Sequence, residues 1–324
     1  NMNARGINVI PNLKPGILKR HPYIDLFEKN DVFIKTPDGK APYYGRWWGG
    51  EGRFFDFTGP KGRDTWKQLL EENILKMGTK TVWNDNCEMD GVEDRDFEGK
   101  KGTMAELKIL HSNLMAYTAK HALAEVYPGE RPYIINRAGY AGIQRYAQVW
   151  GGDNLTDWRT VKFNIATILG MGLSGCSNMG CDIGGFAGPA PEADLLLRWL
   201  QNGVLQPRFC LNSANNDNTV TQPWMYEENL PYIREAYKLR YRLMPTLYSL
   251  MYESNQDGMP AWRPLFLEFP DDPKCYTDKN LTFMFGKSIL VANVVEKGAT
   301  TRTIYLPVGC KWYDMSDNLR EYEG

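Results

Sequence analysis

The chain has 324 residues, and 38 lysines and arginines against 39 aspartates and glutamates give it a formal net charge of −1. This balance argues against nucleic-acid binding, which needs a basic face to neutralise phosphates. With 43% hydrophobic and 24% charged residues, the sequence is typical of a globular protein. No apolar run approaches the roughly 20 residues that span a bilayer, so we expect no membrane association. The first residues lack a signal-peptide pattern, and nothing in the sequence assigns a compartment or an oligomeric state.

The cysteines and histidines do not form a metal-binding pattern. Six cysteines are scattered along the chain, and Cys176 and Cys181 lie in a C-x4-C spacing with no second pair or nearby histidine. The three histidines lie in unrelated settings. The sequence therefore predicts free thiols, no metal site and no cofactor.

Up to about Asn212, short apolar stretches alternate with amphipathic ones, which is typical of parallel strands joined by helices. The predicted strands cover residues 7–13, 80–85, 131–137, 148–153, 174–182 and 204–209. The predicted helices cover 65–77 after an Asp64 cap, 104–126, a segment that begins after Thr156 or Asp157 and ends near 171, and 191–203 with Pro191 in its first turn.

Polar residues recur where these strands end, and this favours a closed barrel over an open sheet. In a (β/α)8 barrel that rim forms the active site, whereas an open sheet binds ligands at one switch point. No dinucleotide fingerprint or P-loop is present. We therefore predict an α/β fold with a (β/α)8 TIM barrel. Because only six strands are found and unpaired edges are costly, we expect the first two barrel strands to lie upstream of Asn1. The rim residues are Asn12, Lys14, Asp85, Arg137, Asp153, Asp182 and Asn212.

The pattern changes after a long helix expected at 230–255. Strands expected at 263–269, 282–285, 288–295 and 300–306 follow one another without helices, which indicates the start of an antiparallel β-sandwich domain. We expect the barrel portion at 1–257 and the β domain at 258–324. A long inserted loop at 14–64 carries Trp47, Trp48, Phe54, Phe55 and Phe57, and loops of this length are usually functional.

Two carboxylates lie at predicted strand ends. Asp85 ends one strand, with Glu88 and Asp90 in the loop behind it, and Asp153 ends another. Glycosidic bond cleavage uses such a pair, one carboxylate acting at the anomeric carbon and one acid protonating the leaving oxygen. Acidic residues at strand ends also serve as helix caps and surface charges, so the pair alone leaves both interpretations open.

The sequence motifs around these residues resemble those of glycoside hydrolase family 31, the retaining α-glycosidases. WNDNCE is similar to the family's W-[IN]-D-M-N-E nucleophile motif, and the resemblance continues in order along nearly the whole chain. The other matching segments are GRFFDFTGP, RPYIINRAGYAGIQRYAQVWGGDN, GCDIGGF, LLLRWLQNGVLQPRF, QPWMY, RYRLMPTLYSL, RPLFLEFPDD, FMFGKSILVANVV and YLPVGCKWYD.

The resemblance implies that Asp85 is the nucleophile and Asp153 the general acid/base. The carboxyl groups of a retaining pair lie roughly 5–5.5 Å apart. We expect Arg137 to keep Asp85 ionised, and a drier setting such as the face of Trp150 to surround Asp153. Lys14 either touches substrate or pairs with an acid. The substrate contacts that the resemblance implies are Trp48 or its neighbour Trp47, Trp83, Arg137, Trp150, Asp182 and Asn212.

Several positions depart from the family pattern. Asn86 and Cys87 stand where the motif has Met and Asn, and Asn212 replaces a histidine that contacts a sugar hydroxyl. Thr221 and Gln222 replace an Arg-Glu pair. These changes spare both carboxylates but leave the identity of the bound sugar open.

The sequence therefore predicts a retaining α-glycosidase, most simply of the α-glucosidase type, that acts on an oligosaccharide or glycoside without a cofactor. One alternative is an α-transglycosylase, such as a 6-α-glucosyltransferase, in which a sugar hydroxyl replaces water. An α-galactosidase or α-N-acetylgalactosaminidase of the same family is another. A carbohydrate-binding relative without activity is the alternative outside enzymes.

Overall fold

The computed structural model describes residues 2–89, 92, 98–99, 102–277, 279 and 281–324. Asp90, one of the acidic residues noted in the sequence, lies outside these residues. The chain divides into two compact units, Asn1–Trp150 and Gly151–Gly324. Within the described residues, no helix combines the length and the apolar character that a membrane crossing requires.

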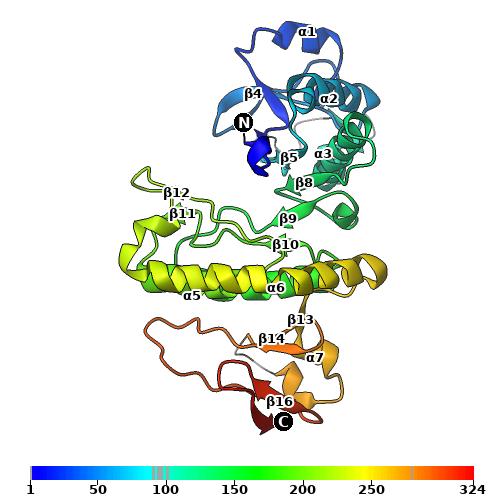
Figure 1. Ribbon diagram of the computed structural model, residues 1–324. Coiled ribbons are helices and arrows are strands. Elements are labelled where there is room, and N and C mark those ends of the chain that lie inside the picture. Colours follow the sequence, from blue (N-terminus) through cyan, green and yellow to red (C-terminus); the bar gives the residue numbers. More distant parts are fainter. Residues whose placement is uncertain (1, 90–91, 93–97, 100–101, 278, 280) are drawn as a thin grey trace. The chain divides into compact units, whose positions relative to one another are not determined.

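A parallel sheet with helices packed against it forms the core of the first unit (Figure 1). Its strands pair in the order β1-β5-β8-β9, and α2 and α3 lie between β1 and β5 and between β5 and β8 in the chain, which agrees with the predicted alternation. Leu70 of α2, Leu123 of α3 and Val82 of β5 share one buried cluster, so burial of these apolar side chains holds both helices against the sheet. The bounds are β1 (Asn12–Leu13), α2 (Pro60–Asn73), β5 (Thr81–Asn84), α3 (Met104–Val126), β8 (Tyr133–Asn136) and β9 (Gln148–Trp150).

The segment 14–64 is more ordered than the inserted loop that the sequence predicts. It forms an antiparallel sheet in the order β2-β4-β3 and a short helix. Glycine usually indicates a turn in a sequence, but Gly52 lies within a strand. A Cβ at this position would come within 2.4 Å of the carbonyl oxygen of Ile17 on the paired strand, so the close approach requires glycine. Aromatic residues bury the segment against α2. The elements are β2 (Gly16–Leu18), α1 (Ile24–Lys29), β3 (Gly45–Trp47) and β4 (Gly50–Phe54), and the buried aromatics are Phe27, Phe33, Phe55, Phe57 and Trp66.

The remaining elements of the first unit are short. The expected helix at 65–77 begins earlier than predicted, because Gly59 takes the cap position and Pro60 presets the first turn. Thr103 and Glu106 form a capping box at the start of α3. A small hairpin and three single-turn helices complete the unit: β6 (Glu98–Gly99), β7 (Gly102–Thr103), η1 (Asn3–Arg5), η2 (Leu75–Met77) and η3 (Ile143–Arg145).

Long helices dominate the second unit. Asp157 caps α4, its side chain accepting a hydrogen bond from the Thr160 N–H at 2.7 Å, as one of the two expected caps. The helix after Pro191 begins two residues later than predicted. The elements of the second unit before residue 260 are α4 (Trp158–Leu173), β10 (Met179–Gly180), β11 (Ala187–Gly188), α5 (Ala193–Gly203), β12 (Ala214–Asn215), η4 (Pro223–Met225), η5 (Glu227–Asn229) and α6 (Leu230–Asp257).

The strand expected at 204–209 is wrong. Arg240 of α6 donates to the carbonyl oxygens of Val204 and Pro207, each at 3.0 Å. Pro207 has no N–H to give to a neighbouring strand, and side chains satisfy these carbonyls instead. The segment is thus irregular backbone held by one buried arginine.

The last residues form small antiparallel sheets. β13, β14 and β15 pair in that order, and β16 pairs with β17. The strand expected at 263–269 stops at Pro264, after which α7 begins; no strand lies at 300–306, and the β16–β17 hairpin was not expected. The bounds are β13 (Trp262–Pro264), α7 (Leu265–Glu268), η6 (Pro273–Tyr276), β14 (Phe283–Phe285), β15 (Ile289–Val291), β16 (Lys311–Asp314) and β17 (Arg320–Glu323).

Candidate active site

Asp85 follows the last residue of β5, at the carboxyl end of the first unit's parallel sheet. The register pairs Leu13 with Asn84, and the Asp85 N–H donates to the carbonyl oxygen of Leu13 at 2.8 Å. Because of this register, Lys14, the residue after β1, lies beside Asp85, the residue after β5. The strand pairing therefore decides which side chains surround this carboxylate.

Both oxygens of Asp85 accept hydrogen bonds. Asn12 Nδ2 donates to Oδ2 at 3.1 Å, and the Lys14 ammonium contacts the same oxygen. The Asn86 N–H donates to Oδ1 at 2.9 Å, and Arg137 Nη1 lies 3.3 Å from Oδ1. With its side chain only 13% exposed, the carboxylate is held in one orientation by four donors.

These contacts favour the ionised carboxylate. Burial raises the pKa of Asp85, but the hydrogen bonds from Lys14 and Asn12, the Lys14 charge and the Asn86 N–H outweigh it and lower the pKa below its ordinary value. Arg137, to which the sequence assigned this role, lies 3.3 Å from Asp85 Oδ1 through Nη1, and its Nε also pairs with Glu88 Oε1 at 2.8 Å. For Lys14 the sequence left open a contact with substrate or a pair with an acid, and the structure pairs it with Asp85.

Trp83 and Trp150 lie together. Their rings meet edge to face, with centroids 5.2 Å apart and planes at 87°. Trp83 belongs to β5 and Trp150 to β9, and Trp150 is the more buried of the two. The structure brings these two predicted sugar-site residues side by side, and their contact with substrate stays a prediction.

The two neighbouring tryptophans of segment 14–64 have different settings. The register pairs Trp47 with Gly50, so Trp48 lies in the two-residue turn of the β3–β4 hairpin. Trp47 packs edge-on against Phe54 at 5.0 Å, whereas Trp48 is 80% exposed. Trp48 Nε1 donates to the side chain of Asn86 at 3.2 Å. Of the two, Trp48 is therefore the one whose ring lies next to the Asp85 loop.

Asp182 in the second unit is fully buried. Arg208 Nη1 donates to its Oδ1 at 2.8 Å, and Asn212 Nδ2 donates to its Oδ2 at 3.1 Å. Burial raises the pKa of Asp182 to about 6, the charge and hydrogen bond of Arg208 lower it, and the negative charge of Asp153 raises it. The predicted residues Asp182 and Asn212 thus share one network. Arg208, not singled out from the sequence, completes it.

Asp153 does not have the dry setting that the sequence predicts. It comes three residues after the end of β9, behind Gly152, whose φ of 78° turns the chain, and its side chain is exposed. Its effect on Asp182 shows that the two carboxylates are electrostatic neighbours. Two glycines, Gly151 and Gly152, separate the end of β9 from Asp153 and bring no side chain to cover it.

Among the described residues, no group of three histidine, cysteine or acidic side chains could hold a metal ion. His111, buried 3.8 Å from Asp56, is kept neutral because burial lowers its pKa to about 4.

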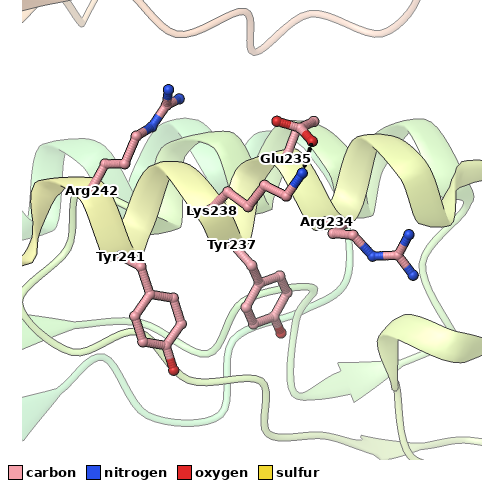
Figure 2. Close-up of a pocket in the computed structure, with 6 residues that line it drawn as sticks. All are labelled: Arg234, Glu235, Tyr237, Lys238, Tyr241 and Arg242. Atoms are coloured by element: carbon pink, nitrogen blue, oxygen red, sulfur yellow. Dashed lines mark hydrogen bonds and ion pairs between the residues drawn. The ribbon is translucent and has the colours of Figure 1, made fainter.

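A separate hollow of about 560 Å³ lies on α6 and contains none of the predicted site residues. Figure 2 shows Tyr237 and Tyr241 projecting together from one side of the helix, and Lys238 pairing with Glu235 at 2.7 Å. Tyr237 packs edge-on against Phe209 at 5.1 Å. The hollow is therefore a surface feature of a packed helix.

Two family profiles match the chain. Residues 1–250 match the profile described as "Glycosyl hydrolases family 31 TIM-barrel domain", and residues 258–324 match the "Glycosyl hydrolase family 31 C-terminal domain". The first match confirms the (β/α)8 barrel predicted from the rim residues.

Curated relatives and solved structures agree with these matches. The chain is 33% identical over 325 residues to "Alpha-glucosidase 2" of Bacillus thermoamyloliquefaciens, with 97% of this chain and 40% of that protein covered. It is 36% identical over 339 residues to a "Probable glucan 1,3-alpha-glucosidase" of Oryza sativa subsp. japonica, with 99% and 36% covered. A family 31 dextranase of Flavobacterium johnsoniae, complexed with glucose, superposes with a TM-score of 0.92 at 29% identity, with 99% and 41% covered. The chain thus spans about two fifths of the length of these relatives.

Proposed function

Because the chain belongs to glycoside hydrolase family 31, we propose that it acts as a retaining α-glycosidase of the α-glucosidase type, with Asp85 as the nucleophile. The observation that carries the proposal is the set of donors around Asp85, which keeps this strand-end carboxylate ionised and oriented. The relatives named α-glucosidases support the glucosidase type. The substrate class is a glycoside or oligosaccharide with a terminal α-linked sugar.

In this proposal, Asp85 attacks the anomeric carbon and forms a covalent glycosyl ester. The leaving oxygen takes a proton, and water later cleaves the ester with inversion at the same carbon, so the two steps together retain the configuration. When the ester forms, Asp85 loses its negative charge. Lys14 and Asn12 then remain in place to stabilise the carboxylate that departs in the second step.

Asp153 serves as the general acid and base. It protonates the leaving oxygen in the first step and takes a proton from water in the second. Its exposed side chain on a glycine-bounded turn suits a group that must meet both a bulky leaving sugar and an incoming water. A bound sugar would supply the apolar cover that the chain itself does not give to Asp153.

Asp182, Arg208 and Asn212 form the candidate site for sugar hydroxyls. Asn212 offers both a donor and an acceptor where the family motif has a histidine. Its Nδ2 donates one hydrogen bond to Asp182, so the second N–H and the amide oxygen are the groups it can offer to substrate in this arrangement. Trp48, Trp83 and Trp150 supply flat apolar faces on which sugar rings stack.

A substrate screen tests this function. The full-length protein is offered aryl α-glucoside, α-galactoside, α-xyloside and N-acetyl-α-galactosaminide, and the anomer released first is read by NMR. We expect turnover of the α-glucoside with the α-anomer released first. Inversion of the anomer would overturn the proposal.

The variant Asp85→Ala tests the nucleophile. We expect its kcat/KM to fall roughly a thousandfold or more while the fold is retained. Asp38→Ala, at an exposed aspartate of the same unit, is the matched control and should keep full activity. Equal activity of Asp85→Ala and the control would contradict the assignment.

Product analysis separates hydrolysis from transglycosylation. At high concentrations of an α-1,4- or α-1,6-linked glucoside, a hydrolase releases glucose, whereas a transglycosylase forms oligosaccharides longer than the donor. Longer products would move the proposal to the second reaction while leaving the roles of Asp85 and Asp153 unchanged.

A further inference from the structure

Asn86, the residue after the proposed nucleophile, has an unusual backbone conformation. Its φ of 49° lies in the left-handed region, where asparagine is one of the few side chains that are tolerated. The Asn86 N–H donates to Asp85 Oδ1 at 2.9 Å. The backbone of Asn86 therefore serves the nucleophile, and its side chain is left to make a different contact.

That side chain joins two segments that are 38 positions apart. Asn86 Oδ1 accepts a hydrogen bond from Trp48 Nε1 at 3.2 Å. The Lys14 ammonium lies 5.4 Å from the centroid of the Trp48 ring, within the range of a cation–π contact. The indole is thus held at its edge by Asn86 and over its ring by Lys14, which also contacts Asp85.

The rest of the hairpin gives Trp48 little support. Trp48 lies in the two-residue turn between β3 and β4, and 80% of its surface is exposed. The neighbouring Trp47 packs onto Phe54 and anchors the strands. An exposed side chain at a turn samples several rotamers unless a specific contact selects one. The hydrogen bond to Asn86 is directional and, together with Lys14 over the ring, favours one orientation of Trp48.

We propose that Asn86 is a positioning residue that fixes Trp48 as a preformed stacking wall for a sugar ring beside Asp85. This inference rests on the proposed function, since it names what the wall receives: the apolar face of a pyranose in an α-glycoside. The family motif has methionine here, whose thioether is a weak acceptor and does not provide this hydrogen bond. The Asn86–Trp48 hydrogen bond therefore depends on the asparagine that this chain has in place of the motif's methionine.

The geometry predicts an effect on binding and not on bond cleavage. The Asn86 side chain faces Trp48, whereas its backbone N–H faces the nucleophile. Removing only the side chain should raise KM and leave kcat nearly unchanged. Because one hydrogen bond contributes modestly, we expect KM to rise two- to tenfold, on the order of one such contact.

Asn86→Gly is the variant that removes the side chain, since glycine adopts the left-handed conformation freely. Asn318→Gly is the matched control, because Asn318 has a φ of 48° in the turn between β16 and β17. A KM unchanged in Asn86→Gly, or a fall in kcat at constant KM, would overturn the proposal.

A double-mutant cycle shows whether Asn86 acts through Trp48. Trp48→Phe keeps an aromatic face but removes the Nε1 donor. If the hydrogen bond is the link, Asn86→Gly should raise KM in the unsubstituted protein and have no further effect in Trp48→Phe. Additive effects of the two substitutions would contradict the inference.

Indole NMR tests the contact without relying on activity. With ¹⁵N-labelled tryptophan, the Nε1–H signal that disappears in Trp48→Phe is that of Trp48. We expect this signal to shift and to exchange faster with water in Asn86→Gly, but not in Asn318→Gly. If the signal responds in this way but the protein is inactive, the proposed function is wrong and the positioning role of Asn86 stands. If the signal does not respond, the positioning role itself is wrong.

Discussion

Asp85 and Asp182 are two buried carboxylates with opposite electrostatic outcomes. Asp85 is partly buried in the first unit and meets four donors, two of them cationic, and its pKa is lowered. Asp182 is fully buried in the second unit with Arg208 and Asn212, and its pKa is raised to about 6. The favourable contacts outweigh the desolvation of the carboxylate at Asp85, whereas desolvation outweighs them at Asp182.

This difference fits two chemical tasks. A nucleophile has to be ionised throughout the working pH range, and a carboxylate that accepts four hydrogen bonds stays so. A carboxyl near its titration point can donate or accept hydrogen bonds to a sugar hydroxyl. The number of donors and the solvent exposure, more than the residue type, decide which task each aspartate suits.

The largest expected effect is the loss of the Asp182 partner. Arg208→Met should reduce the free energy of unfolding by about 3–5 kcal/mol, because it leaves a charge buried and unpaired. Arg137→Met, next to the partly exposed Asp85, should cost much less. Urea unfolding of both variants at pH 7.5 measures the difference, and the penalty of Arg208→Met should shrink at pH 5, where Asp182 takes up a proton. Equal penalties would remove the contrast between the two sites.

Lys14→Met tests the Asp85 side of the comparison. Without the Lys14 charge and hydrogen bond the pKa of Asp85 rises, so the acid limb of the kcat/KM profile should move to higher pH. Lys19→Met, which removes a lysine from an exposed pair with Glu51, is the control and should leave the profile unchanged. An unmoved acid limb in a folded Lys14→Met protein would show that Lys14 does not control this charge.

The pH dependence of stability tests Asp182 directly. A carboxyl whose folded pKa is raised binds more protons folded than unfolded, so its contribution to stability is present below pH 3.8 and is lost as the pH rises to about 6. Relative to Asp182→Asn, which does not titrate, the native protein should therefore lose on the order of 2 kcal/mol between pH 4 and pH 7. A constant difference across this range would contradict the raised pKa.

The neutral donors should give the smallest effects. Asn12→Ala removes one hydrogen bond from Asp85, and Asn212→Ala removes one from Asp182. Each should cost about 1 kcal/mol in unfolding free energy. In both variants the carboxyl pKa should rise, by less than Lys14→Met raises that of Asp85. A larger shift in Asn12→Ala than in Lys14→Met would mean that orientation, and not charge, controls the nucleophile.

Local patterns in the sequence were enough to place several parts of the site. Val82 and its neighbours form a short apolar run that ends at Asp85, and the run folds as β5. Asp157 precedes a helical pattern and caps α4. These features depend on residues only a few positions apart, so they are visible along the chain.

Other features depend on contacts that no local pattern records. The segment 14–64 reads as a loop because its strands contain glycines such as Gly52, whose need appears only when β2 lies beside β4. The segment 204–209 was expected to be a strand, yet Arg240 of a later helix donates to the carbonyl oxygens of Val204 and Pro207. In both places tertiary hydrogen bonding overrides the local preference.

The sequence by itself determined the barrel class, the family resemblance and the position of Asp85 at the end of a strand, because motifs and periodicity are properties of neighbouring residues. The tertiary structure decided the electrostatic state of the site. Lys14 reaches Asp85 through the β1–β5 register, and Trp48, in the turn between β3 and β4, reaches Asn86 in the loop after β5. Charge and hydrogen bonding act through space, so burial and register, which the linear order of residues does not contain, set the ionisation of Asp85 and Asp182.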